Sequence, residues 1–146
     1  MTTFMELALD EARAAARAGE VPIGCVVVRD GAVVARAGNR TIAERDPTAH
    51  AEMVAIRLAA ALLGSERLAD CDLYVTLEPC AMCAAALALA RIRRLYYGAA
   101  DDKGGAVENG VRFFASPTCH HRPEVYGGIA EAEASALLKD FFRERR

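Results

Sequence analysis

The sequence lacks an excess of basic residues. Its 146 residues include 18 Lys and Arg against 20 Asp and Glu, which gives a formal net charge of −2. A protein that coats nucleic acid without sequence preference normally carries a strong positive charge. The composition therefore excludes a nonspecific nucleic-acid coat, while local basic patches are still compatible with it.

Long uninterrupted apolar runs are also absent. No apolar stretch reaches the length needed to cross a bilayer, and residues 2–18 carry Glu6, Asp10 and Glu11 inside their apolar pattern. These acids leave no apolar block for a secretory signal and are atypical of a mitochondrial transit peptide. We therefore expect no membrane association and a cytoplasmic location.

The cysteine count indicates free thiols. The chain has five cysteines, an odd number in a sequence without an export signal. Such usage is typical of a reducing cytoplasm, not of a disulfide framework. We expect Cys25 and Cys71 to be small buried residues at or beside strands. A different explanation is needed for Cys80 and Cys83.

The apolar pattern predicts one domain, residues 1–146, built from alternating strands and helices. Helices are expected at residues 3–18, 49–63, 80–91 and 131–145, strands at 23–28, 33–37, 73–76 and 95–98, and an edge strand or loop at 122–126. Asp30-Gly31, between the first two strands, is typical of a hairpin turn. Two later passages through strand, helix and strand favour parallel pairing in a mixed sheet with helices on both faces.

Two short motifs carry the chemistry, His50-Ala-Glu52 and Pro79-Cys80-Ala-Met-Cys83. A neutral imidazole and two thiolates suit Zn²⁺. Three protein ligands, His50, Cys80 and Cys83, leave one tetrahedral position for water, whereas a structural zinc site closes all four positions. The sequence therefore predicts one catalytic zinc ion per chain.

Helix starts explain how these residues converge. His50 and Glu52 are about 200° apart around a helix, so both reach a metal only if it lies off the helix N-terminus. Cys80 and Cys83 share a face in the first turn of the next helix. Two helix N-termini directed at one site favour thiolates and developing negative charge. Glu52 is then predicted to move the proton of water in a metal-assisted hydrolysis.

The same residues carry a resemblance to a known family. His50-Ala-Glu52 with Pro79-Cys80-x-x-Cys83 resembles the signature of the zinc-dependent cytidine-deaminase-like superfamily. More narrowly, the chain is similar to the bacterial tRNA-specific adenosine deaminases. The segments that carry this similarity span nearly the whole chain and are Val21-Pro-Ile-Gly24, Gly38-Asn-Arg40, Asp46-Pro-Thr-Ala-His-Ala-Glu52, Leu73-Tyr-Val-Thr-Leu-Glu-Pro-Cys80 and Phe141-Phe-Arg143.

The resemblance implies a fold, an assembly and a reaction. The family fold is a five-stranded mixed sheet in a three-layer α/β/α arrangement, usually in a homodimer with each active site near the subunit interface. The implied ligands of zinc are His50, Cys80 and Cys83, and Glu52 is the implied proton shuttle. The implied reaction converts the wobble adenosine of a tRNA anticodon loop to inosine.

The resemblance also implies which residues contact the RNA substrate. One is the asparagine that contacts the target nucleotide, two lie in a substrate-side loop at residues 101–105, and two lie on the last helix, which approaches the RNA. These residues are Asn39, Asp101, Lys103, Phe142 and Arg143. After this loop many relatives continue with a Gly-Ser-Leu-Met-like stretch, where this chain has Ala106-Val-Glu-Asn-Gly110.

Four alternatives stay open on the residues alone. A Cys-x-x-Cys at a strand-to-helix turn is also typical of a thioredoxin-like redox motif. Cys119-His120-His121 could supply a fourth ligand to a closed structural zinc site. The principal alternative function is the same deamination on a free base or nucleoside, such as guanine or cytosine. A zinc-stabilised RNA-binding module is the non-enzymatic alternative, and it leaves Glu52 without a role.

Overall fold

The computed structural model describes residues 2–145, and residues 1 and 146 lie outside that range. In chain order the elements are α1 (Phe4–Arg17), β1 (Gly24–Arg29), β2 (Ala32–Gly38), α2 (Ala51–Leu63), β3 (Cys71–Leu77), α3 (Ala81–Ala90), β4 (Arg94–Ala99), the short 3₁₀ helix η1 (Phe113–Ala115), β5 (Glu124–Tyr126) and α4 (Glu131–Glu144). All nine expected helices and strands occur within residues 2–145, with boundaries within two residues of the prediction. No helix in that range is both long and apolar enough to cross a membrane.

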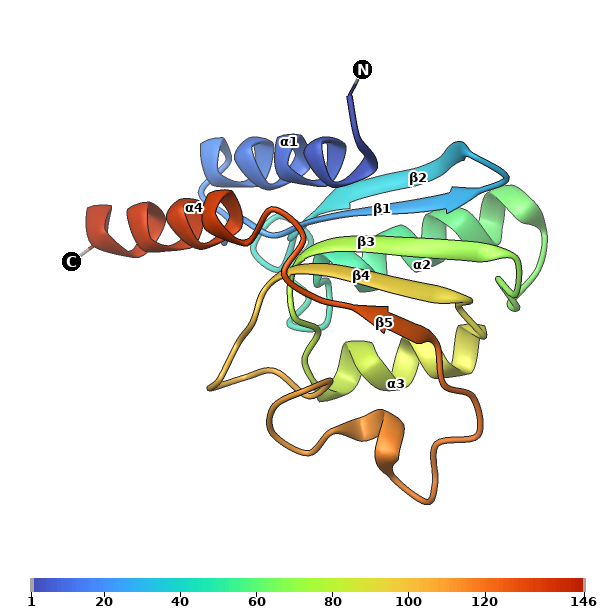
Figure 1. The fold of residues 1–146 in the computed structure, drawn as a ribbon. Helices are drawn as coiled ribbons and strands as arrows, with labels where there is room; N and C mark the ends of the chain where they lie inside the picture. The colour runs from blue at the N-terminus through green and yellow to red at the C-terminus, as the bar shows by residue number, and fades with distance from the viewer. Residues whose placement is uncertain (1, 146) are drawn as a thin grey trace.

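The five strands form one sheet between two layers of helices, as Figure 1 shows. The strand order is β2-β1-β3-β4-β5. Helices α1 and α4 cover one face of the sheet, and α2 and α3 cover the other. The predicted three-layer α/β/α fold is therefore confirmed.

The sheet is mixed, because its strands do not all run in the same direction. β1 pairs antiparallel with both β2 and β3, whereas β3 pairs parallel with β4 and β4 pairs parallel with β5. The β1–β2 hairpin turns at Asp30 and Gly31, whose φ angles of 51° and 75° are those of a two-residue turn of the mirror-image type. The expected parallel pairing holds for β3 and β4. β2 and β3 also point the same way, but β1 lies between them.

Helix α1 begins with a capping box and packs directly on the sheet. The backbone amide of Glu6 donates to Thr3 Oγ1 at 3.1 Å, and the amide of Thr3 donates to Glu6 Oε2 at 3.3 Å. The contact with β1 is so close that a Cβ atom added at Gly24 would lie 1.8 Å from the carbonyl oxygen of Ala8. Glycine at this position therefore sets the spacing between α1 and the sheet.

The larger buried cluster lies between the sheet and the layer formed by α2 and α3. It includes Cys25 and Cys71, which confirms that both are small buried residues on strands. It also includes Cys83, in the first turn of α3. The functional motifs thus stand on helices that are fixed by the main core.

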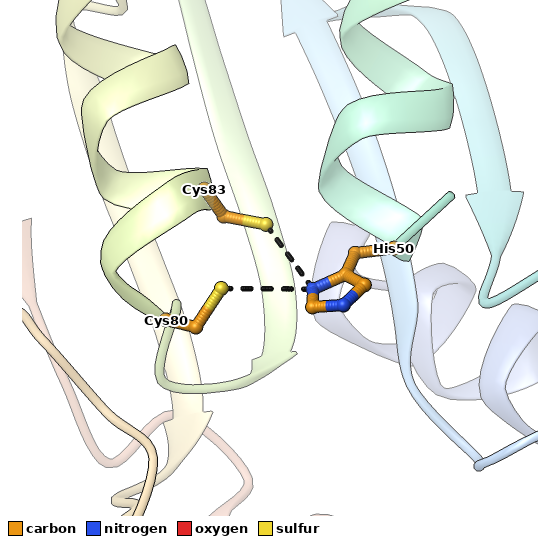
Figure 2. A group of neighbouring side chains, drawn as sticks. All are labelled: His50, Cys80 and Cys83. Atoms are coloured by element: carbon orange, nitrogen blue, oxygen red, sulfur yellow. Dashed lines mark hydrogen bonds between the residues drawn. The ribbon is translucent and has the colours of Figure 1, made fainter. Parts of the chain in front are cut away.

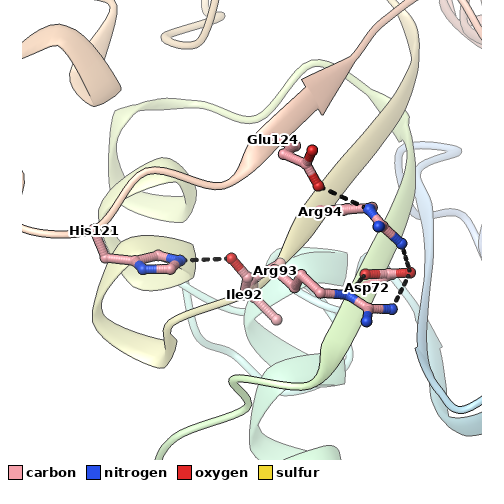
Figure 3. A network of polar contacts seen from close by, with 6 residues as sticks. All are labelled: Asp72, Ile92, Arg93, Arg94, His121 and Glu124. Carbon is pink, nitrogen blue, oxygen red and sulfur yellow. Dashed lines mark hydrogen bonds and ion pairs between the residues drawn. The ribbon is translucent and has the colours of Figure 1, made fainter.

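A polar network joins the starts of β3, β4 and β5 (Figure 3). Asp72 accepts two hydrogen bonds from Arg93, from Nε at 3.0 Å and from Nη2 at 3.1 Å. Arg94 Nη1 lies 3.8 Å from Asp72 Oδ2, and Arg94 Nε donates to Glu124 Oε2 at 2.8 Å. These contacts hold the short edge strand β5 in register with β4.

Candidate active site

His50, Cys80 and Cys83 come together where α2 and α3 begin, with the imidazole facing both sulfurs in Figure 2. His50 Nδ1 lies 3.6 Å from Cys80 Sγ and 3.5 Å from Cys83 Sγ. The three ligand atoms all lie within 4.8 Å of one another. Tetrahedral zinc, with Zn–S near 2.3 Å and Zn–N near 2.0–2.1 Å, requires N···S separations of about 3.5–3.6 Å. The donor set therefore fits zinc in both chemistry and spacing.

The helix starts place two of these residues at N-cap positions. His50 caps α2 with φ −67° and ψ 154°, and Cys80 caps α3 with φ −73° and ψ 176°. The prediction that His50 and Cys80 lie within the first turns of their helices is wrong for both, since α2 begins at Ala51 and α3 at Ala81. Neither residue makes a side-chain capping hydrogen bond, because both side chains turn toward the common site.

The closeness of the two sulfurs, whose atoms lie within 4.8 Å of each other, sets the acidity of the two thiols. Interaction with the Cys83 thiol, acting against burial, lowers the pKa of Cys80 to about 5. The same interaction, together with burial, raises the pKa of Cys83. The pair therefore holds one thiolate beside the imidazole, which is the form that binds soft divalent metals.

Glu52 lies in the first turn of α2 and is 4% exposed. Burial raises the pKa of Glu52 to about 7, although interaction of the carboxyl group with its own backbone amide opposes that shift. Glu52 does not belong to the cluster of three potential ligands in the described chain. A buried carboxyl group that titrates near neutrality, beside a metal site and outside its ligand set, is suited to move a proton.

Asn39 lies on a loop that adjoins the metal site through the backbone. The amide of its neighbour Arg40 donates to the carbonyl of Ala49 at 2.9 Å, one residue before His50. Asn39 is 6% exposed, and its Nδ2 lies 3.4 Å from Glu20 Oε1. These contacts hold the Asn39 side chain against Glu20 and place the neighbouring backbone beside the segment that precedes His50.

The other residues that were predicted to contact the substrate do not all line the same groove. Asp101, Lys103 and Phe142 line one groove of about 430 Å³ between the loop after β4 and helix α4. Arg143 does not line that groove. Its side chain is 76% exposed and lies 3.7 Å from Asp140 Oδ1.

The structure contains two buried carboxylates that sequence reasoning missed. Glu20 and Glu78 are each 2% exposed, and both accept hydrogen bonds from the backbone amides of loops distant in sequence. Burial alone would raise the pKa of Glu78, but hydrogen bonds from Asp101 and Asn109 outweigh it and lower that pKa. For Glu78, the sequence feature that could have indicated a role was its position directly after the apolar strand β3.

The predicted fourth-ligand candidates are engaged elsewhere. His121 Nε2 lies 2.7 Å from the carbonyl oxygen of Ile92, two residues before the start of β4 (Figure 3). Cys119 Sγ donates to the carbonyl oxygen of His121 at 3.0 Å, and His120 is exposed. Among residues 2–145, the potential metal ligands that cluster are limited to His50, Cys80 and Cys83. This geometry leaves the fourth coordination position without a protein ligand.

Comparisons with known proteins agree with this site. Residues 1–99 match the cytidine and deoxycytidylate deaminase zinc-binding region, which includes the three clustered residues and Glu52. The tRNA-specific adenosine deaminase of Agrobacterium fabrum is 66% identical over 145 residues, which cover 99% of this chain and 95% of that protein. Its counterpart in Bacillus subtilis is 43% identical over 143 residues, covering 98% and 89%.

Two solved structures that are similar to this chain are also structures of deaminases. One, from a study of A-to-I editing by tRNA:A34 deaminases at the wobble position of transfer RNA, has a TM-score of 0.92 and 66% identity. It covers 92% of this chain and 98% of that chain. A guanine deaminase from Nitrosomonas europaea has a TM-score of 0.81 and 25% identity, covering 94% and 81%. The relative of higher identity is thus the one that acts on transfer RNA.

Proposed function

Because the chain belongs to the family of the cytidine and deoxycytidylate deaminase zinc-binding region, we propose that it is a zinc-dependent hydrolase that converts adenosine to inosine at the wobble position of tRNA. The observation that carries the substrate is the 66% identity, over 99% of this chain, to a tRNA-specific adenosine deaminase. The fit of His50, Cys80 and Cys83 to zinc supports the chemistry. Deamination of a free base or nucleoside is not favoured.

The proposed roles follow from the geometry of the site. His50, Cys80 and Cys83 would hold zinc, which when bound supplies a Lewis acid that lowers the pKa of water from 15.7 to about 7. Water adds at C6 of adenine and the exocyclic amino group leaves as ammonia. The Glu52 carboxylate accepts the proton of the attacking water, passes it to the substrate and assists the departure of ammonia. Its burial keeps that proton from exchanging with bulk solvent.

Substrate contacts form the second part of the proposal. The target base must be unstacked to enter the site, and an anticodon loop already presents splayed bases. Asn39 would contact the target nucleotide on the His50 side. Lys103 and Phe142, on the groove walls, would contact a phosphate and a flanking base. Asp101 accepts hydrogen bonds from the amides of Lys103 and Gly104 and so holds the backbone of its own loop. The exposed Arg143 would contact a phosphate of the RNA from helix α4.

We expect the protein to form inosine at the first anticodon position of a stem-loop with the anticodon A-C-G. Free adenosine should be far poorer, because stacking on protein side chains contributes about 1–3 kcal/mol per base, so losing two flanking nucleotides predicts kcat/KM lower by about 10²-fold or more. Inosine formation and ammonia release measure both reactions.

The matched controls are a stem-loop with guanosine in place of the wobble adenosine, and free guanine and cytosine. Added salt should slow the reaction at subsaturating RNA, because phosphate contacts release counterions. Efficient consumption of free guanine or cytosine, with the stem-loop left intact, would replace the proposed substrate by the alternative.

A homodimer is proposed from the layer of helices that carries the site. Helix α3 contains no charged residue, and Leu89 on its surface is 74% exposed. On α2, Leu58 and Leu62 are 49% and 66% exposed. Large apolar side chains exposed on neighbouring helices are typical of a surface buried by another protein chain. The chemistry of this surface suits a second copy, which presents the same apolar residues in a symmetric contact.

Replacing Leu62 or Leu89 by glutamate is expected to convert the dimer to a monomer. A charge buried without a partner at the centre of an interface disfavours association by several kcal/mol. Light scattering after gel filtration gives the mass, which should fall from about twice 15.6 kDa to that value. Val33→Glu, on the edge strand β2, is the matched control and should leave the mass unchanged. A monomeric parent protein would contradict the proposal.

A cytoplasmic location belongs to the same proposal. The two ligand cysteines must stay reduced to bind zinc, and Cys25, Cys71 and Cys119 are also free thiols. A chain of this kind is suited to a reducing compartment.

A further inference from the structure

Glu78 is a buried carboxylate at the end of β3, two residues before Cys80. Its Oε1 accepts from the amide of Asp101 at 2.9 Å and from Asn109 Nδ2 at 2.7 Å. Its Oε2 accepts from the amides of Val107, Glu108 and Asn109 at 3.1, 2.9 and 3.0 Å. One side chain therefore binds five N–H groups, all of them from a loop 23 to 31 residues further along the chain.

That loop has no regular secondary structure to define its shape. Between the end of β4 at Ala99 and the start of η1 at Phe113 it contains neither helix nor strand, and in Figure 1 it passes beside α3 on the side where the site lies. The amide of Ala106 donates to the carbonyl of Pro79 at 2.9 Å. The loop is thus attached to the Glu78–Pro79 segment immediately before Cys80.

The loop also approaches Glu78 as closely as sterics allow. A Cβ atom at Gly105 would lie 2.6 Å from Glu78 Cδ and 2.4 Å from the carbonyl oxygen of Asp101. The opposite side of the loop is fixed by Tyr97, whose hydroxyl donates to the Glu108 carboxylate. The Glu78 carboxylate and the loop are therefore closely packed against each other in a buried contact.

The chemistry of this contact requires a carboxylate. All five partners are N–H donors, and an ionised carboxylate offers only acceptors. A glutamine of the same size has one acceptor oxygen and an NH₂ group, which would face N–H groups with no acceptor among them. Hydrogen bonds to a charged group are also about twice as strong as neutral ones.

We propose that Glu78 is a positioning residue, which holds the substrate-side loop against the Cys80 end of the metal site and thereby sets the affinity for the RNA substrate. This inference rests on the proposed function. Asp101 and Lys103, at the start of the same loop, line the groove beside α4. Glu78 itself is buried under the loop that it binds, so it is not placed to contact the substrate. Its loss should therefore act on binding and leave metal content and the chemical step in place.

The test is the variant Glu78→Gln, whose backbone hydrogen exchange is measured first, in the absence of RNA. Hydrogen exchange at the amides of Asp101 and residues 107–109 should accelerate by about tenfold or more, as expected for loss of charge-assisted bonds. The amides of Ile42 and Ala43, which donate to Glu20 instead, are the internal control and should not change. Unchanged exchange at residues 107–109 would overturn the proposal.

The second measurement, steady-state kinetics with the RNA, separates substrate binding from the chemical step. With the anticodon stem-loop, Glu78→Gln should raise KM by about tenfold or more while kcat stays within about threefold and zinc stays at one per chain. Lower kcat with unchanged KM, or loss of zinc, would overturn the proposal, because either result places the action of Glu78 at the metal site.

Two further variants keep the test decisive if Glu78→Gln does not fold. Asn109→Ala removes one of the five donors and should change exchange and KM in the same direction but less. Glu78→Asp keeps the charge and should restore part of the parental KM. No rise in KM for Asn109→Ala would overturn the proposal. A parental protein that does not deaminate the stem-loop would instead refute the proposed function, and the hydrogen-exchange reading tests the loop contact without it.

Discussion

Glu52→Ala is expected to retain one zinc ion per chain and to lose activity by about 10²–10⁴-fold, the range for a positioned acid–base group. The reason is that Glu52 lies outside the cluster of metal ligands, yet it is buried beside Cys83 in the first turn of α2. No other buried acid within residues 2–145 stands in this first turn. Removing it leaves the attacking water without a proton acceptor.

The measurement pairs single-turnover deamination with metal analysis. Glu52→Gln keeps the size of the side chain but cannot accept a proton, so it should be as slow as Glu52→Ala. Glu66→Gln, at an exposed acid away from the site, is the matched control and should keep the parental rate. Near-parental turnover by Glu52→Ala would show that the proposed mechanism is wrong.

Cys83→Ala is expected to lose the metal, and activity with it. Three protein ligands hold the proposed ion, and Cys83 is fully buried in the core cluster, so no solvent-facing side chain can replace its sulfur. After dialysis against buffer without chelator, the zinc content should be one ion per chain in the parent and about a tenth of that or less in Cys83→Ala. A chelator should also lower the melting temperature of the parent but not of Cys83→Ala, because the ion binds only the folded state.

The matched control is Cys71→Ala, which removes an equally buried thiol from β3 and should keep zinc. X-ray absorption of the parental protein should find two sulfur and two lighter scatterers around zinc. Parental zinc content in Cys83→Ala, or four protein ligands without solvent exchange, would end the catalytic interpretation.

Much of the fold could be predicted from local patterns. Capping at Thr3, the Asp30-Gly31 turn and the glycine that ends α2 at Gly64 are each decided by neighbouring residues. The insertion of β1 between β2 and β3 could not be predicted, because strand order depends on contacts between distant segments.

The metal site was predictable because ligand spacing and helix starts are local features. His50, Cys80 and Cys83 meet as expected, although His50 and Cys80 are N-cap residues and do not lie inside the first turns of their helices. The role of Glu78 was not visible, because its five partners come from a loop without any periodic pattern. The resemblance grouped Arg143 with Phe142, but only Phe142 lines the groove, because consecutive residues of a helix point about 100° apart.

The use of His50 and Cys80 as N-cap residues without capping hydrogen bonds creates a conflict between stability and activity. A serine at either position would satisfy a free amide at the helix start and add about 1 kcal/mol to stability. It would also remove a metal ligand. In the metal-free protein, selection for stability alone would therefore favour inactive sequences at these two positions, and a protein engineer seeking a more robust variant should leave both helix starts uncapped.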